Sequence, residues 1–170
     1  ITIDWRAPIS SMYYDSNIGK SSYEAPEGTC TGELLLKRQY DIEESELKSF
    51  QDVDTVSNDD LLKPYLSASA DNRLKNIVST IQQEQNSIIR EPLSKNIIIQ
   101  GVAGSGKTTV ALHRIAYLVY NNRDKIKPNQ YLVIGPNKFF VNYISGVLPD
   151  LDVENVKQLT YEELCAEFLN

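Results

Sequence analysis

The pattern of apolar and polar residues changes along the chain, and its first part is typical of β-structure. Up to about residue 52, short apolar or aromatic runs are separated by turn-forming residues. This pattern predicts short extended runs and a long strand that turns back into a further one: residues 2–5, 11–14, 31–42 and 46–50, with the turn at 43–45. Gly28 is expected in the turn before the long strand, and Gly32 at a bulge within it.

Helical periodicity takes over from Asn58. Residues 59–66 predict a short helix, and a longer helix is expected to start at Asp71 and to end before Pro92. The apolar positions of the longer helix fall on one face: Leu74, Ile77, Val78, Ile81, Ile88 and Ile89.

Strands and helices alternate in the last part of the chain. The predicted elements are a buried strand at 96–100, a helix at 109–118, a turn at 127–129, a buried strand at 131–134 and a helix at 139–148. Thr160 and Glu163 have capping-box spacing, which opens a last helix through Phe168. Such alternation predicts an α/β fold with a parallel sheet. The chain would divide into a β-rich segment (1–52), a helical segment (53–95) and an α/β segment (96–170).

A phosphate-binding loop lies between the strand expected at 96–100 and the helix expected at 109–118. Residues 101–108 read G-x-x-x-x-G-K-T. Lys107 would reach the β- and γ-phosphates as the catalytic residue, and the Thr108 hydroxyl would ligate Mg²⁺. The expected nucleotide-binding residues are Gly101, Val102, Ala103, Gly104, Ser105, Gly106, Lys107, Thr108 and Thr109.

Gln85, 22 positions before Lys107, is a candidate for reading the base of the nucleotide. A glutamine amide both donates and accepts, so it can pair with an adenine ring nitrogen and the adenine amino group, whereas guanine presents the opposite pattern. The alternative is a glutamine on a solvated helix face. With the phosphate loop present, we expect ATP and Mg²⁺ as cofactors.

Composition narrows the class of protein. The net charge of −6 makes the chain a poor non-specific DNA binder by itself. No apolar run approaches the ~20 residues of a membrane span. Cys30 and Cys165 match no metal-ligand spacing and fit a reduced, cytoplasmic protein without membrane contact. Because the chain starts at Ile1 and not at Met, we expect a piece of a longer protein. We expect this piece to be monomeric.

Residues 81–120 resemble the superfamily 1 helicases of the UvrD/Rep type, in which a glutamine motif precedes the phosphate loop. Residues 131–138 and 156–161 stand where that family carries its motifs Ia and Ib, which line the single-strand path. The resemblance implies a RecA-like P-loop NTPase sheet, of which this chain holds the first part of lobe 1A. It also implies nucleic-acid contacts, with DNA the expected strand, at Pro136, Asn137, Lys138 and Thr160.

A narrower resemblance covers nearly the whole chain and points to the HelD-like ATPases, which bind bacterial RNA polymerase. It is carried by D-W-R-A-P-I-S at 4–10, by residues 32–34 and 37–40, by the phosphate loop with residues 111–117, and by G-P-N at 135–137. Membership implies ATP-driven release of polymerase from nucleic acid. No apolar run leads into a Walker B acid pair, and no second lobe supplies arginine fingers, so we expect ATP binding without turnover.

Three other functions fit parts of the pattern. A UvrD/Rep-type DNA helicase would share the glutamine motif and the phosphate loop, but would not need the β-rich segment. A P-loop kinase acting on a small molecule would need a lid and would not need Gln85. A non-enzymatic polymerase-binding module would keep ATP only as a structural ligand.

Overall fold

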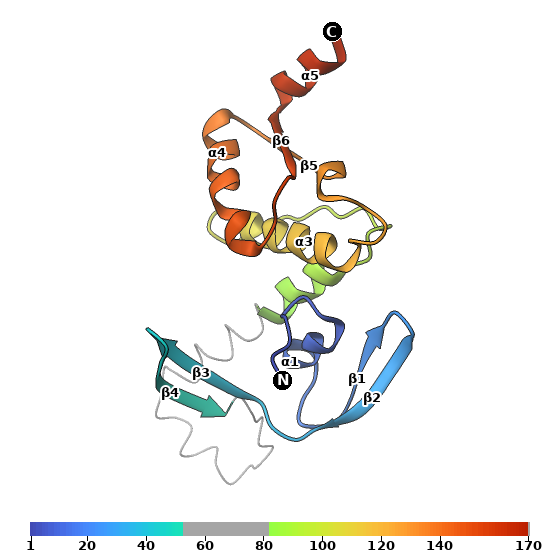
Figure 1. The fold of residues 1–170 in the computed structure, drawn as a ribbon, viewed down its shortest axis with the longest axis vertical. Coiled ribbons are helices and arrows are strands. Elements are labelled where there is room, and N and C mark those ends of the chain that lie inside the picture. Colours follow the sequence, from blue (N-terminus) through green and yellow to red (C-terminus); the bar gives the residue numbers. More distant parts are fainter. Residues whose placement is uncertain (53–81, 170) are drawn as a thin grey trace. The chain divides into compact units, whose positions relative to one another are not determined.

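The computed structural model of the chain describes residues 1–52 and 82–169 (Figure 1). These residues form two compact units, Ile1–Asn86 and Ser87–Asn170. The helix predicted at 59–66, and the first part of the helix predicted from Asp71, lie outside the described residues. The later part of that helix is observed at residues 82–90, and it ends before Pro92 as predicted.

The first unit opens with a closed turn built around Asp4. The Asp4 carbonyl accepts hydrogen bonds from the Ala7 backbone N–H at 3.1 Å and from the Ser10 hydroxyl at 2.7 Å. The chain then winds through a 3₁₀-helix, η1 (Pro8–Ser11), and a short α1 (Met12–Asp15). The extended run predicted at 11–14 is therefore wrong: Pro8 starts a helical turn, and the described residues offer this aromatic run no strand partner.

Two antiparallel hairpins follow: β1 (Gly19–Ala25) with β2 (Gly28–Leu34), and β3 (Arg38–Glu43) with β4 (Glu46–Asp52) (Figure 1). The single long strand predicted at 31–42 is thus wrong, because its two ends pair in different hairpins and residues 35–37 pair with neither.

Of the two local features predicted for these hairpins, the turn at 43–45 is observed and the bulge at Gly32 is not. The turn at 43–45 is confirmed: Glu44 and Ser45 take the left-handed φ values of 50° and 67° that a two-residue hairpin loop requires. The bulge predicted at Gly32 is wrong, because Gly32 pairs regularly with Ser21. The register shift lies in the other hairpin, where Lys48 is the additional residue.

The second unit carries the helices and a parallel pair of strands. Its elements are α3 (Lys107–Asn121), η3 (Pro128–Gln130), β5 (Leu132–Gly135), α4 (Lys138–Val147), η4 (Pro149–Leu151), β6 (Lys157–Thr160) and α5 (Tyr161–Leu169). The helices predicted at 109–118 and 139–148 and the last helix are therefore confirmed. The strand predicted at 131–134 is also observed, but its predicted burial is wrong, because Leu132 and Ile134 are 43% and 49% exposed. β5 and β6 pair in parallel, with Leu132 opposite Lys157 and Gly135 opposite Thr160.

The strand predicted at 96–100 is not observed. These residues have no strand assignment, and Ile98 is 91% exposed. A parallel strand is stable when neighbouring strands and helices cover it on both sides. Among the described residues the parallel sheet has only β5 and β6, and within the run at 97–99 Ile98 is exposed while Ile97 and Ile99 are half-buried. The α/β class is confirmed in this reduced form.

A packed core is present in the second unit. α3 contributes Val110, Leu112, Ala116 and Leu118, all less than 9% exposed. α4 and the segment that leads into β6 add Ile144, Leu148, Val153 and Val156, and Ile89 is the remaining buried apolar residue of this unit. No helix in the described residues is long and apolar enough to cross a lipid bilayer.

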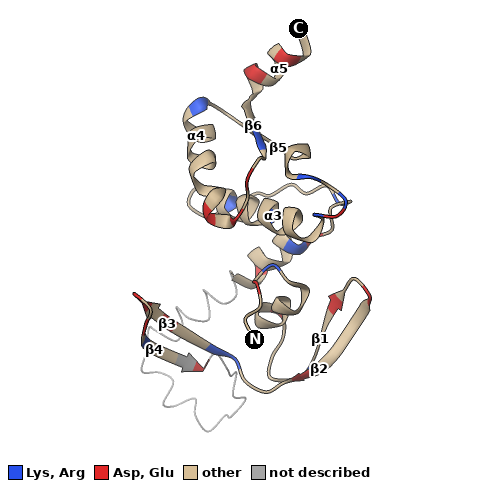
Figure 2. Cartoon of the chain, viewed as in Figure 1, with Lys and Arg blue, Asp and Glu red and all other residues tan. Residues whose placement is uncertain are grey.

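Acidic residues are gathered at the tip of the β3–β4 hairpin in the first unit, as Figure 2 shows. Glu43, Glu44 and Glu46 follow one another closely there.

Candidate functional site

The predicted phosphate loop, residues 101–106, runs directly into α3. Gly104 and Gly106 have φ values of 79° and 83°, which side chains disfavour, and Gly106 is the N-cap residue of the helix. A Cβ atom on Gly101 would lie 2.5 Å from the Ser105 hydroxyl oxygen. The left-handed backbone thus favours glycine at positions 104 and 106, whereas a side chain at position 101 would require the Ser105 hydroxyl to move.

Lys107 lies across this loop. Its ammonium donates hydrogen bonds to the backbone carbonyls of Gly101 at 2.9 Å and Val102 at 2.8 Å. Ser105 N–H closes the loop from the other side by donating to the Val102 carbonyl at 3.2 Å. The Lys107 ammonium is thus held against the backbone of the loop, and both of these partners are neutral carbonyl oxygens.

The N-terminus of α3 is open to an anion. No side chain caps it, and its first turn holds no acidic residue. The first N–H groups of a helix have no acceptor inside the helix, and the helix dipole adds positive potential there. Residues 101–105 and Thr109 are exposed, while Thr108 is half-buried beside Lys107. The predicted nucleotide site is therefore accessible, and its uncapped helix start suits a phosphate group. Thr108, the predicted Mg²⁺ ligand, lies in the first turn of that helix.

Gln85 is half-buried on the helix at 82–90. The next residue, Asn86, is buried, and its amide lies 3.4 Å from both carboxylate oxygens of Asp15. Gln85 belongs to the first unit and the phosphate loop to the second. Its role as the adenine reader stays a prediction.

Arg114 is a residue that motif analysis missed. Its Nη1 donates to the carbonyls of Ile88, Ile89 and Glu91 at 3.0, 3.1 and 2.7 Å, and its Nη2 to that of Pro92 at 3.2 Å. Burial lowers the pKa of the guanidinium, which remains charged at neutral pH. Only its place in the H-R-I-A-Y run, about two turns after Lys107 on α3, could have drawn attention to it.

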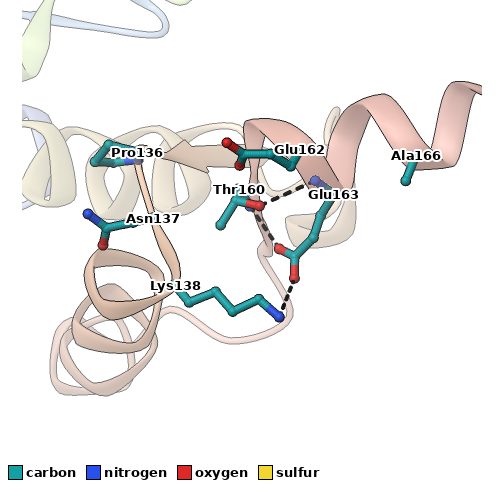
Figure 3. Close-up of a pocket in the computed structure, with 7 residues that line it drawn as sticks. All are labelled: Pro136, Asn137, Lys138, Thr160, Glu162, Glu163 and Ala166. Carbon is teal, nitrogen blue, oxygen red and sulfur yellow. Dashed lines mark hydrogen bonds and ion pairs between the residues drawn. The ribbon is translucent and has the colours of Figure 1, made fainter.

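The four residues predicted to contact nucleic acid line one hollow of about 480 Å³, with a carboxylate-bearing helix on its other side (Figure 3). The lining consists of Pro136, Asn137, Lys138, Thr160, Glu162, Glu163 and Ala166. Two separate sequence segments, one at the start of α4 and one at the start of α5, thus meet at the carboxyl ends of β5 and β6.

Hydrogen bonds already engage much of the polar lining. The predicted capping box is confirmed, because Thr160 N–H donates to Glu163 Oε2 at 2.9 Å and Glu163 N–H donates to Thr160 Oγ1 at 3.2 Å. The hydrogen bond from the Thr160 N–H is the main reason that the pKa of Glu163 lies below its ordinary value. The Lys138 ammonium lies 3.4 Å from the Glu163 carboxylate, and Asn137 Oδ1 caps α4 by accepting from Phe140 N–H at 2.9 Å (Figure 3).

Comparison with known protein families agrees with this arrangement. The family model of the UvrD/REP helicase N-terminal domain matches residues 81–138, which contain Gln85, the phosphate loop, α3 and the start of α4. These residues are therefore similar to a helicase domain of the UvrD class. The model of the N-terminal domain of DNA helicase IV, HelD, matches residues 1–63. Together the two matches support a HelD-like, UvrD-type helicase N-terminal fragment. No curated protein matches the chain at a significant level.

Proposed function

We propose that this chain binds ATP with Mg²⁺ at residues 101–109, as the first part of a RecA-like lobe 1A, and that the whole protein uses ATP hydrolysis to release RNA polymerase from nucleic acid. The observation that carries the nucleotide site is the Lys107 ammonium, held on the carbonyls of Gly101 and Val102 beside the uncapped N-terminus of α3. A cation, an uncapped helix N-terminus and glycines with left-handed backbone on one short segment suit a phosphate-bearing ligand.

Each residue of the site has a separate task in this proposal. ATP supplies the hydrolysable phosphoanhydride, and Mg²⁺ neutralises charge on its phosphate oxygens. Lys107 exchanges two neutral carbonyl partners for charged phosphate oxygens, which bind an ammonium more strongly. The Thr108 hydroxyl takes one Mg²⁺ position, and the Gln85 amide reads the adenine edge.

Removing the Lys107 ammonium tests the nucleotide site. Ligand at about 100 times its dissociation constant stabilises a protein by about 2.7 kcal/mol. We expect ATP to raise the melting temperature of the 170-residue chain, and Lys107→Ala to abolish that rise. Lys125→Ala removes an exposed lysine beyond the end of α3 and is the matched control. A rise that persists in Lys107→Ala contradicts the site.

The hollow lined by Pro136, Asn137, Lys138 and Thr160 is proposed as the contact with a single strand, and the matched UvrD/REP domain supports it. Lys138 is the cation of its lining, and Glu163 competes with phosphate for that cation. Glu163→Gln is therefore expected to tighten the binding of a single-stranded oligonucleotide a few-fold at low salt. Lys138→Ala in the Glu163→Gln background removes this gain. Unchanged binding in Glu163→Gln contradicts the contact.

Polymerase release, and not unwinding, is the proposed output, because the first 63 residues match the HelD N-terminal domain. A UvrD/Rep-type DNA helicase is the second candidate, supported by the match over residues 81–138. The whole protein decides between them: release of stalled polymerase in the absence of duplex unwinding supports the first. A module that keeps ATP only structurally would release polymerase equally well with a non-hydrolysable analogue.

The 170-residue chain alone is proposed to bind ATP without hydrolysing it. Its sequence offers no Walker B acid and no second lobe, and an arginine finger contributes about 10³- to 10⁵-fold in related enzymes. A phosphate-release assay measures this directly. Steady turnover that disappears in Lys107→Ala would reveal a catalytic carboxylate within these residues.

A further inference from the structure

The leading arm, residues 93–100, is the stretch of the second unit that runs into the predicted phosphate loop. It forms no helix or strand, and Ile98 within it is 91% exposed. Among the described residues, its backbone takes part in one hydrogen bond, from Lys95 N–H to the Pro92 carbonyl at 3.1 Å. The hydrogen bonds that fix the leading arm to its surroundings therefore lie at its two ends.

Arg114 of α3 holds the chain where the leading arm starts. Its two terminal nitrogens donate at 2.7–3.2 Å to the backbone carbonyls of four residues of the second unit: Ile88, Ile89, Glu91 and Pro92. Three of these carbonyls share Nη1, which has two hydrogens, so one hydrogen serves two acceptors. Because Glu91 and Pro92 directly precede the leading arm, these bonds set the position and direction in which it leaves α3.

Lys107 of the same helix holds the chain where the leading arm ends. Its ammonium donates to the carbonyls of Gly101 and Val102, the first two residues after the arm. Arg114 follows Lys107 by seven positions, or about two turns, so the two side chains leave the same face of α3. One face of α3 thus fastens both ends of the leading arm, each through a cation on backbone carbonyls.

The two fastenings differ in what a phosphate ligand does to them. In the proposed function, the Lys107 ammonium leaves the Gly101 and Val102 carbonyls for phosphate oxygens, whereas the carbonyls held by Arg114 lie outside the loop. We infer that Arg114 is a positioning residue for phosphate binding: it keeps the leading arm on α3 when Lys107 turns to the phosphates, without touching the ligand. This inference rests on the proposed nucleotide site.

Losing the Arg114 donors should therefore weaken phosphate binding while α3 stays packed. Arg114→Met keeps most of the side-chain length and the apolar stem while removing every donor. A leading arm without this fastening has to be ordered when the ligand binds, and ordering the backbone of even one residue costs about tenfold in affinity. Arg90→Met is the matched control, because the Arg90 guanidinium lies over the Tyr117 ring of α3, 5.2 Å from its centroid, and ties the neighbouring residue to the same helix.

Calorimetry on the 170-residue chain with tripolyphosphate, which has no base, provides the test. Arg90→Met is expected to bind within about twofold of the parent chain, and Arg114→Met about tenfold more weakly. Arg114→Lys should fall between them, because an ammonium keeps the charge but has only three donors on a single atom. Hydrogen exchange at the core residues Ala116 and Ile144, measured at the same temperature, should stay within about twofold of the parent in every variant.

Each other outcome overturns the inference in a recognisable way. Parent-like affinity in Arg114→Met shows that the leading arm does not need this fastening. Weaker binding that comes with faster exchange at Ala116 and Ile144 shows that Arg114 only maintains the fold. An equal loss in Arg90→Met assigns the effect to contacts with α3 in general. If Arg114→Met does not fold, Arg114→Lys decides, and parent-like affinity there overturns the inference. A parent chain that does not bind tripolyphosphate refutes the nucleotide site itself.

Discussion

The two units of this chain are stabilised in opposite ways. In the second unit, apolar side chains from α3, α4 and the segment before β6 are buried together, and Ile144 and Leu148 are 1% and 2% exposed. In the described part of the first unit, the residues that are buried to the same degree are polar: Arg6 and Asn86. One unit is held by packing, and the described part of the other by hydrogen bonds and ion pairs.

The β3–β4 hairpin makes the contrast concrete. The additional residue Lys48 brings Leu47 opposite Ile42, next to the pair of Tyr40 and Phe50. All four of these side chains remain 55–62% exposed. A two-stranded hairpin with open apolar residues is marginal alone. The nucleotide and helicase motifs lie mainly on the packed unit, whereas the described residues of the first unit are joined mainly by hydrogen bonds and hairpin pairing.

The largest effect is expected from truncating the same residue type in each unit. Leu148→Ala should lower the free energy of unfolding of the second unit by about 3 kcal/mol, because a cavity opens in a packed core. Leu47→Ala, at a 56% exposed position, should cost about 0.5 kcal/mol or less. Hydrogen exchange resolved by residue measures both units in one experiment. Equal losses would show that the hairpin face is covered in solution.

The next effect concerns the polar pair of the first unit. Arg6 donates to both carboxylate oxygens of Asp4, at 2.9 and 2.7 Å, and also donates its backbone N–H at 2.8 Å. Asp4→Asn should destabilise the turn at residues 4–10 by about 1–2 kcal/mol, because a buried guanidinium loses its charged partner. Exchange in the second unit should not change.

The same pair gives the first unit a distinct pH dependence. The hydrogen bonds from Arg6 lower the pKa of Asp4 below its ordinary value of 3.8. A lowered pKa in the folded state means that the stabilisation is complete above about pH 4 and is lost as pH falls through the lowered value. Acid titration of the parent chain should therefore weaken the turn at residues 4–10, and Asp4→Asn should remove that step. A step of equal size in Asp4→Asn would assign it to another carboxyl.

A smaller effect is expected from the helix cap at the hollow. Thr160→Ala removes the hydroxyl that accepts from Glu163 N–H and should cost about 1 kcal/mol, a typical N-cap value. Thr160→Ser keeps the hydroxyl and should recover most of this stability. Thermal unfolding measures both variants. If Thr160→Ser is as unstable as Thr160→Ala, the buried methyl group is what matters.

The smallest effect is expected at the Arg38–Asp52 pair, which joins the open ends of β3 and β4. The hydrogen bond with Arg38 holds the pKa of Asp52 below its ordinary value. The Arg38 and Asp52 side chains are nevertheless 31% and 48% exposed, and ion pairs open to solvent contribute little. Arg38→Gln should leave the melting temperature unchanged within error. It should also remove the stacking of the guanidinium over Phe50, 4.5 Å from the ring centroid, and this is visible as a shift of the Phe50 ring signals by NMR. A measurable drop in melting temperature would show that this face of the hairpin is not open.

Local rules were enough for the features that depend on a few neighbouring residues. The glycines and Lys107 predict where the loop ends and α3 begins, and Thr160 with Glu163 predicts the start of α5, because caps and left-handed turns are decided by adjacent backbone groups. The hairpin turn at 43–45 follows the same logic.

Only the tertiary structure decided the features that depend on distant partners. Residues 31–42 have the pattern of one strand, but each end pairs in a different hairpin. The run at 97–99 has the pattern of a buried strand, but it forms no strand and Ile98 is 91% exposed. The contacts of Arg114 cross more than 20 positions of sequence, so no local pattern reveals them. Strand pairing, burial and the hydrogen bonds of a buried arginine all depend on which segments of the chain come into contact. The order of residues within one segment does not contain that information.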